Sequence, residues 1–230
     1  MANDHPLDRP IWSALTTRQA PLALGDQRAL RYAPEYEPFA AAADASPASY
    51  AALKALDRFD DHLVVVEAEP VLPPGSVSDF EVQPAVVQML WASGSAPAEA
   101  DFIFHELGDE DAPEMFKLAA LTQPGPYAVH THGLGGFIGV RREGRLIAMA
   151  GERMKPEGFT EVSGVCTRPD HRGQGLAAGL MRTVIARILA RGETPFLHVM
   201  RDNRAARELY QRMGFRDYRE SVVRVVSLAT

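Results

Sequence analysis

The sequence has 230 residues, of which 46% are hydrophobic and 23% are charged. This balance is typical of a folded globular protein and excludes a disordered or collagen-like chain. The formal net charge of −6 argues against a nucleic-acid partner that is bound by bulk electrostatics.

Neither a membrane span nor a secretion signal is predicted. The longest nearly apolar runs, residues 85–92 and 176–190, contain polar residues and are shorter than the ~20 residues that a span needs. The first twelve residues lack the basic and then apolar pattern of a secretion signal. A single cysteine, Cys166, excludes an internal disulfide and a multi-cysteine zinc site. We therefore expect a cytoplasmic protein with no membrane partner and no bound metal.

The first part of the chain, residues 1–98, is expected to form an N-terminal α/β half with a structural role. Residues 63–67 predict a short buried strand, and residues 71–78 are rich in proline and predict a turn region. Residues 84–91 could form a helix with a proline in its first turn. No internal repeat and no catalytic constellation is found in this half.

Residues 99–230 alternate between predicted strands and helices. We expect strands over residues 102–107, 137–141, 145–153, 159–167, 195–200 and 222–228. One helix is expected over residues 112–121 and a second one starts after Gly175. A third helix is expected to start with Asp202 or Asn203 as its N-cap and to end at Gly214. Glu143-Gly144 between two of the strands is a hairpin signal. Gly164 lies inside a predicted strand, which indicates a bulge or a close approach of the backbone to another group.

A strand, a glycine-rich turn and a helix follow one another around Gly173 and Gly175. The N-terminus of a helix has unpaired N–H groups and a partial positive charge, which favour an anion. The two glycines let a ligand approach the backbone, and Arg172 is a fork-shaped donor suited to phosphate. The turn is not a Walker A loop, because no Gly-Lys-Ser/Thr follows, and Ala178 replaces the third glycine of Gly-x-Gly-x-x-Gly.

Charge is distributed unevenly along the chain. Residues 168–191 contain five arginines and one acidic residue, whereas residues 99–114 contain seven acidic residues and no lysine or arginine. The basic segment surrounds the glycine turn and favours a small polyanion there. The acidic segment could attract a cationic amine, although a solvated loop and helix start is the simpler explanation.

The glycine turn resembles a known family. Arg172-Gly173-Gln174-Gly175-Leu176-Ala177 is similar to the Gln/Arg-x-x-Gly-x-Gly/Ala signature of the GNAT N-acetyltransferases. Arg168-Pro169 upstream resembles the proline before that family's pyrophosphate loop. The family's downstream segment, Asn-x-x-Ala-x-x-Leu-Tyr-x-x-x-Gly-Phe, is matched by Asn203, Ala206, Leu209, Tyr210, Gly214 and Phe215.

The resemblance covers residues from about 100 to the end and is greatest to the glycine N-acyltransferase-like branch. It implies a mixed α/β fold around a twisted mixed sheet, in which residues 99–230 form the acyltransferase domain. The N-terminal half of that branch is a degenerate copy of the same fold. The implied reaction moves an acyl group from acetyl-CoA or another acyl-CoA to the amine of a small molecule or peptide by direct attack.

The resemblance also implies roles for individual residues. Pantetheine would lie in a gap between strands 159–167 and 195–200 and would pair with the backbone of Val165, Cys166 and Thr167. Asn203 would bond the pantetheine arm, and Tyr210 would point its hydroxyl at the thioester sulfur as the acid. The amides that would hold the pyrophosphate belong to Arg172, Gly173, Gln174, Gly175, Leu176 and Ala177.

Acyl transfer to an amine also needs a base within reach. Glu161 is the first candidate, because it alternates onto the same side of its strand as Ser163, and Glu152 is the second. Alternatively, each of these glutamates is a surface side chain at a strand edge with no catalytic role. A backbone N–H near Val165 or Cys166 would hold the oxyanion.

Other functions stay open at this point. A covalent role for Cys166 is disfavoured because no obvious base neighbours it. His130 and His132 lie in a predicted loop that could border the acceptor pocket. The two rival functions are a non-catalytic acyl-CoA-binding regulator and a nucleotide-phosphate enzyme such as a kinase or a dehydrogenase. The valine-rich last strand could be a sheet edge that pairs with a second copy in a homodimer.

Overall fold

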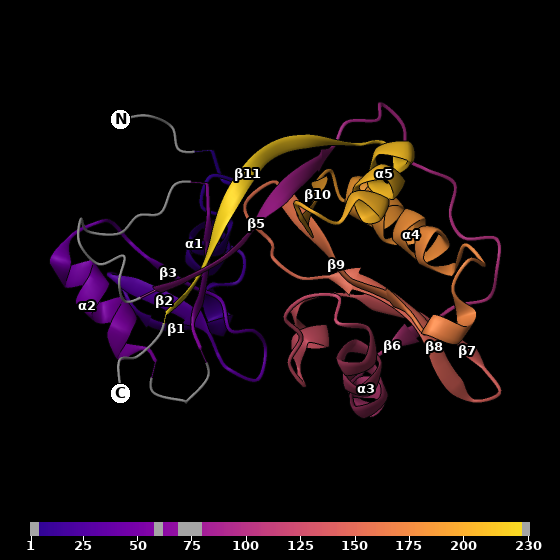
Figure 1. Cartoon of the computed structure of the whole chain (residues 1–230), viewed down its shortest axis with the longest axis horizontal. Helices are drawn as coiled ribbons and strands as arrows, with labels where there is room; N and C mark the ends of the chain where they lie inside the picture. The colour runs from indigo at the N-terminus through magenta and orange to yellow at the C-terminus, as the bar shows by residue number, and fades with distance from the viewer. Residues whose placement is uncertain (1–4, 58–61, 69–79, 227–230) are drawn as a thin grey trace.

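The computed structural model describes residues 5–57, 62–68 and 80–226. It contains a three-stranded sheet and an eight-stranded sheet, and two long strands of the larger sheet extend toward the N-terminal part (Figure 1). The predicted α/β class with a mixed sheet is confirmed. No helix in the described ranges is long and apolar enough to cross a membrane.

The smaller sheet belongs to the N-terminal part and has the antiparallel order β1-β2-β3. Ser46 caps a helix beside it, because its hydroxyl accepts a hydrogen bond of 3.2 Å from the amide of Ser49. The elements of this part are α1 (Pro10–Thr16), the 3-10 turn η1 (Ala20–Leu22), β1 (Ala23–Asp26), β2 (Ala29–Tyr32), β3 (Ala40–Ala42) and α2 (Pro47–Ala55).

The larger sheet has the order β4-β11-β5-β10-β9-β8-β7-β6. All neighbouring strands in it are antiparallel except β9 and β10, which are parallel. Its strands are β4 (Val64–Glu67), β5 (Phe80–Trp91), β6 (His105–Leu107), β7 (Phe137–Arg142), β8 (Arg145–Glu152), β9 (Phe159–Thr167), β10 (Thr194–Met200) and β11 (Phe215–Val226). Because β11 lies between β4 and β5, the expectation that the last strand is a free edge is wrong.

The helix expected over residues 84–91 is also wrong, because this segment is part of β5. Val87 and Met89 are buried against α4, whereas Val86 is buried against the N-terminal part. A strand that is covered on both faces reads as one apolar run, which periodicity alone does not distinguish from a helix. Pro84 is tolerated because it lies beyond the last residue paired with β10 and at an irregular register with β11.

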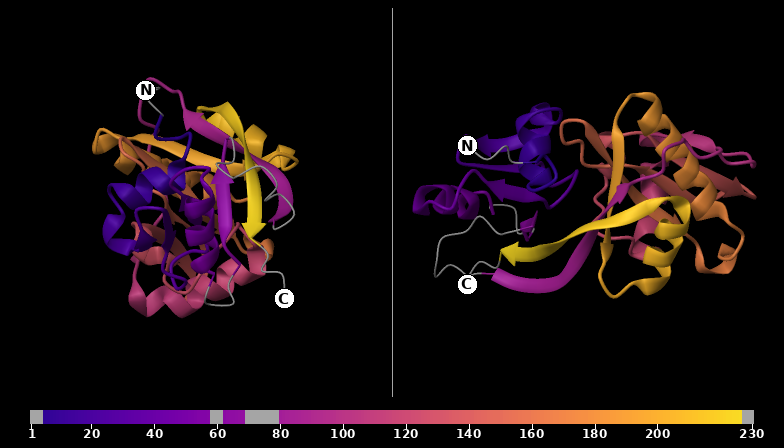
Figure 2. Two further views of the ribbon diagram at one scale, coloured as in Figure 1. Left: turned by 90° about the vertical axis from the view of Figure 1, so that its left-hand side faces the viewer. Right: turned by 90° about the horizontal axis from the view of Figure 1, so that it is seen from above.

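Helices cover both faces of the larger sheet (Figure 1). One face carries α4 (Leu176–Ala190) and α5 (Arg204–Met213), and the other carries α3 (Ala112–Thr122) together with the N-terminal part. Figure 2 shows β5 and β11 running side by side from the larger sheet to the N-terminal part. The predicted apolar stripe of α4 is buried in full, namely Leu180, Met181, Val184, Ile185 and Ile188. Each such side chain contributes about 1.5–3 kcal/mol by leaving water.

Turns and caps fix the remaining element boundaries. The predicted hairpin joins β7 to β8, where Glu143 and Gly144 have φ of 52° and 77°, as a type I′ turn requires. Gly214 ends α5 with φ of 116°, and β11 starts directly after it, earlier than residue 222. The strand expected over residues 102–107 is present only as β6, because Phe102 and Phe104 instead pack beside α4.

Candidate functional site

A gap opens in the larger sheet between β9 and β10. The two strands pair only from Thr194 with Phe159 to Phe196 with Glu161. Beyond this last rung β9 continues to Thr167 and β10 continues to Met200 without pairing to each other. The gap implied by the family resemblance is therefore present.

The bulge expected at Gly164 borders this gap. The register between β8 and β9 shifts there, from Met149 opposite Cys166 to Gly151 opposite Ser163. Gly164 has φ of 61°, and a Cβ at this position would lie 2.5 Å from a ring carbon of Phe137. Both the backbone conformation and the space require glycine. The bulge leaves backbone groups of β9 without ladder partners beside the gap.

A pocket of about 590 Å³ lies beside the end of β9 that does not pair with β10. It is lined by the end of β9, by the glycine turn and by one side of α5. The lining residues are Thr122, Val165, Cys166, Thr167, His171, Arg172, Gly173, Gln174, Gly175, Leu176, Ala177, Ala178, Ala205, Ala206, Leu209 and Tyr210. All the residues expected to hold the cofactor line this pocket except Asn203.

The glycine turn leaves the start of α4 uncapped. Gly173 and Gly175 both have φ of 76°, and a Cβ at either position would meet no atom within 4 Å. Their conformation, and not crowding by the protein, therefore requires glycine. No side chain caps α4, and its first turn contains no acidic residue. The amides at the start of α4 are thus available to an anion in the pocket.

Two polar side chains in the pocket make no hydrogen bond to any described residue. The Thr167 hydroxyl is buried and unpartnered. Tyr210 is half-buried and packs edge-on against Phe215, and burial raises the pKa of its hydroxyl. A phenol with a raised pKa stays protonated at neutral pH and can donate a proton.

In the structure Asn203 caps a helix, and Cys166 is a buried thiol. The side-chain oxygen of Asn203 accepts a hydrogen bond of 3.2 Å from the amide of Ala206 and so caps α5, as predicted. Burial raises the pKa of the Cys166 thiol to about 11. A thiol in that state is a weak nucleophile at neutral pH.

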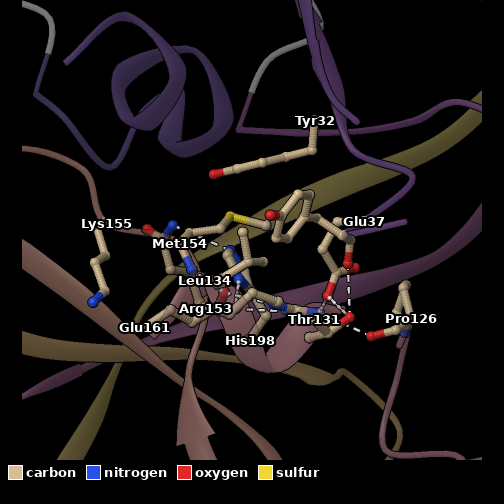
Figure 3. A network of polar contacts seen from close by, with 12 residues as sticks. Tyr32, Glu37, Pro126, Thr131, Leu134, Arg153, Met154, Lys155, Glu161 and His198 are labelled. Atoms are coloured by element: carbon tan, nitrogen blue, oxygen red, sulfur yellow. Dashed lines mark hydrogen bonds and ion pairs between the residues drawn. The ribbon is translucent and has the colours of Figure 1, made fainter. Parts of the chain in front are cut away.

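A buried polar network lies between the larger sheet and the N-terminal part, beside the last rung before the gap (Figure 3). Arg153 donates two hydrogen bonds of 2.9 Å to the two carboxylate oxygens of Glu161. Nδ1 of His198 lies 2.8 Å from Oε1 of Glu161. Burial alone would raise the pKa of Glu161, but Arg153 and His198 outweigh burial and hold the pKa of Glu161 well below its usual range.

The N-terminal part contributes Glu37 to this network (Figure 3). Glu37 is fully buried, and its Oε1 lies 3.9 Å from Nη1 of Arg153 and accepts a hydrogen bond of 3.2 Å from the Thr131 hydroxyl. Burial raises the pKa of Glu37 to about 8, although Arg153 acts in the opposite direction. The second candidate base, Glu152, is buried in ion pairs of 2.9 Å with Lys155 and 2.8 Å with Arg191.

Arg153, His198 and Glu37 were not singled out as site residues from the sequence. The alternation along β9 places Glu161 and Ser163 on one face, but it carries no information about which residues lie opposite them. Glu37 belongs to a part of the chain that has no recognisable motif. Among the described residues, no group of three or more His, Cys, Asp or Glu side chains is arranged to hold a metal ion.

Comparisons with known proteins agree with this geometry. A family model described as FR47-like protein matches residues 137–225. The crystal structure of a GNAT-family protein from Novosphingobium aromaticivorans DSM 12444 is 44% identical, with a TM-score of 0.88, over 99% of this chain and 100% of that one. The chain belongs to the GNAT family. A search of curated proteins found none that matches.

A second solved structure supports the fold of this GNAT protein over nearly its whole length. The GCN5-related N-acetyltransferase from Kribbella flavida aligns with a TM-score of 0.66 over 95% of this chain and 94% of that one, at 16% identity. At this identity the similarity concerns the fold alone. The N-terminal part is included in both alignments, so it is a shared feature of these two GNAT structures and this protein.

Proposed function

We propose that this GNAT protein transfers an acyl group, most favourably acetyl, from acyl-CoA to an amine by direct attack. The observation that carries the proposal is the gap between β9 and β10, which lies beside a pocket that ends at the uncapped start of α4. This arrangement suits a ligand with a diphosphate at one end and a reactive thioester at the other.

The residues that line the pocket suit the parts of acyl-CoA. The amides of Arg172 to Ala177 would hold the pyrophosphate, and Arg172 would add a charge-assisted hydrogen bond. The backbone of Val165, Cys166 and Thr167 would pair with pantetheine, and the unpartnered Thr167 hydroxyl would gain a partner. Asn203 would reach the pantetheine arm with its amide nitrogen while its oxygen caps α5.

The acyl transfer itself would depend on the placement of the two reactants and on a small number of catalytic groups. The gap would place the thioester beside the amine, which removes much of the entropic barrier. A backbone N–H near the bulge at Gly164 and Val165 would hold the oxyanion. Tyr210 would give its proton to the departing thiolate. Glu161 as the base stays a prediction, and its ion pair with Arg153 would have to weaken before it could accept a proton.

The acceptor would be an amine of a small molecule or a peptide. Assignment to the glycine N-acyltransferase-like branch remains a prediction that would make an amino acid the acceptor. Assays with acetyl-CoA and a pooled amine library, followed by detection of free thiol, would identify the acceptor and the activity together.

The proposal is tested by comparing binding and turnover in matched variants. We expect the wild-type chain to bind CoA in calorimetry and to release thiol in the presence of an amine. Tyr210→Phe should keep CoA affinity but lower turnover by roughly 10- to 1000-fold. Tyr218→Phe is the matched control, since Tyr218 does not line the pocket. Absence of CoA binding would refute the proposal, and binding without turnover for any amine would favour a non-catalytic regulator.

A further inference from the structure

The carboxylate of Glu161 has no free acceptor site. Oε1 accepts hydrogen bonds from Arg153 at 2.9 Å and from His198 at 2.8 Å. Oε2 accepts from Arg153 at 2.9 Å and from the amide of Met154 at 3.4 Å. A proton acceptor needs an open lone pair as well as a suitable position. Glu161 has the position but uses its lone pairs to hold its neighbours.

Glu37 is a carboxylate of the same network with an open lone pair. Its Oε2 is buried and makes no hydrogen bond to any residue in the described ranges. The Arg153 guanidinium lies against both Glu37 and Glu161, and Glu161 forms the last rung before the gap. A buried polar atom without a partner is rare in native proteins and calls for an explanation.

A second unpartnered group lies near the bulge at Gly164. The Tyr127 hydroxyl is buried and has no hydrogen-bond partner in the described part of the chain. Tyr127 packs edge-on against Phe137, and a Cβ at Gly164 would lie 3.6 Å from its ring. The carbonyl of Pro126, the residue before Tyr127, accepts a hydrogen bond of 3.4 Å from Nη1 of Arg153, the atom that lies 3.9 Å from Oε1 of Glu37.

A partly exposed loop contacts Glu37. The Thr131 hydroxyl in this loop shares its one hydrogen between the carbonyl of Tyr36 at 2.7 Å and Oε1 of Glu37 at 3.2 Å. Val129 and His130, two and one residues before it, are exposed. The loop that contacts Glu37 therefore faces solvent in part.

We propose that Glu37 and Tyr127 form the subsite for the acceptor amine, and that Glu37 takes the amine proton directly or through one water. In this step the amine nitrogen bonds to the thioester carbon, the carbon–sulfur bond breaks, and the thiolate receives the Tyr210 proton. The proton lost by the nitrogen goes to the Glu37 carboxylate and then to solvent, and the Tyr210 phenolate regains a proton from solvent. The N-terminal part would thus supply a catalytic residue. This inference rests on the proposed function.

The charged groups around Glu37 agree with this role. Arg153 favours the ionised carboxylate, whereas Glu161 opposes ionisation. Burial is the main reason that the pKa of Tyr32 and that of Tyr127 are raised, and the charge of Glu37 adds to both. Burial is the largest influence, and the resulting pKa of about 8 is close to the working pH that an efficient base requires.

The test compares Glu37→Gln with Glu35→Gln, a matched control at an exposed position on the same segment. Both variants and the wild type are assayed with acetyl-CoA and with ethylamine, glycine amide and methoxyamine. Methoxyamine is unprotonated near neutral pH, so any rise in its rate with pH reports a group on the protein. Calorimetry with CoA shows whether the cofactor site is intact, and thermal unfolding shows whether each variant is folded.

We expect Glu37→Gln to keep wild-type CoA affinity and to lower kcat/KM for the amine by roughly 10²- to 10⁴-fold. The rise in rate centred near pH 8 should disappear in this variant but persist in Glu35→Gln. Tyr127→Phe should raise KM for the amine about tenfold, as loss of one hydrogen bond predicts. Wild-type kcat/KM and an unchanged pH profile in Glu37→Gln would overturn the inference, while CoA binding and turnover would still support the proposed function.

A second readout needs no turnover. Carbon-13 labelling of glutamate carboxyl groups should show one signal that titrates near pH 8 and is missing in Glu37→Gln. Ethylamine should shift this signal in the wild-type chain saturated with CoA. A signal that ethylamine does not move would overturn the amine subsite.

Discussion

Arg153 and Glu161 form a two-pronged ion pair in which Nε and Nη2 each donate a hydrogen bond of 2.9 Å to a different carboxylate oxygen. Both side chains are buried, so water screens the pair weakly. Arg153 leaves the end of β8, and Glu161 lies on β9 at the last rung before the gap. The pair therefore holds the end of β8 against β9 at the point where β9 separates from β10.

Removing one partner of this pair should be costly. Glu161→Gln would leave the Arg153 guanidinium buried without its main counter-charge, and we expect a loss of about 3–5 kcal/mol in the free energy of unfolding at pH 7. Urea unfolding of the variant and of Glu157→Gln, an exposed control, would measure it. A loss below about 1 kcal/mol would contradict the strength assigned to the pair.

The difference in stability between the wild type and Glu161→Gln should depend on pH. The pKa of Glu161 is lower in the folded chain than its usual value of 4.5, so its ionised form stabilises the fold above that value. This stabilisation is lost as the pH falls toward the folded pKa. The difference between wild type and Glu161→Gln should therefore shrink on acidification below about pH 4. A stability difference that stays constant from pH 7 down to the pH at which the chain unfolds in acid would contradict the lowered pKa of Glu161.

Glu37 should affect stability in the opposite direction. Its pKa is raised from 4.5 to about 8, so between these values the folded chain binds more protons than the unfolded chain. Stability should fall as the pH rises through this window, by up to about 1.4 kcal/mol per pH unit from this group. Glu37→Gln should remove that slope and be more stable than wild type at pH 9. Thermal unfolding of both chains from pH 5 to 9 measures this slope. If the stability of the two chains changes with pH in parallel, the raised pKa assigned to Glu37 is contradicted.

The sequence predicted the local geometry around the glycine turn better than the buried network around Glu161. The glycine turn, the Asn203 cap, the Gly164 bulge and the α4 stripe are local features, because each depends on residues close together in the chain. The network around Glu161 joins residues 37, 153, 161 and 198, which only the assembled sheet brings together. No spacing rule connects such distant positions. The error over residues 84–91 has a related cause, since burial on both faces removes the periodic signal of a strand.

Cys166 should be slow to react although it lines the pocket. Burial raises the pKa of its thiol to about 11, so only a small fraction is thiolate at pH 8. Alkylation by iodoacetamide should be at least about tenfold slower in the folded chain than in urea, where the pKa returns to about 8.5. As Cys166 is the only cysteine, the unfolded chain is its own control. Rapid alkylation of the folded chain would show that the thiol is activated and would reopen a covalent mechanism.

The glycine turn offers the most direct test of the proposed diphosphate site. Gly175 has φ of 76° at the N-cap of α4, so Gly175→Ala should cost about 1–2 kcal/mol in backbone strain. The added methyl group would stand in open space where the pyrophosphate is expected, since no protein atom lies within 4 Å of it. We expect CoA affinity to fall at least tenfold more than the small loss of stability explains. Gly94→Ala is the matched control, because Gly94 has open space but no positive φ, and it should bind CoA normally. Unchanged CoA affinity in Gly175→Ala would mean that the diphosphate does not lie against this turn.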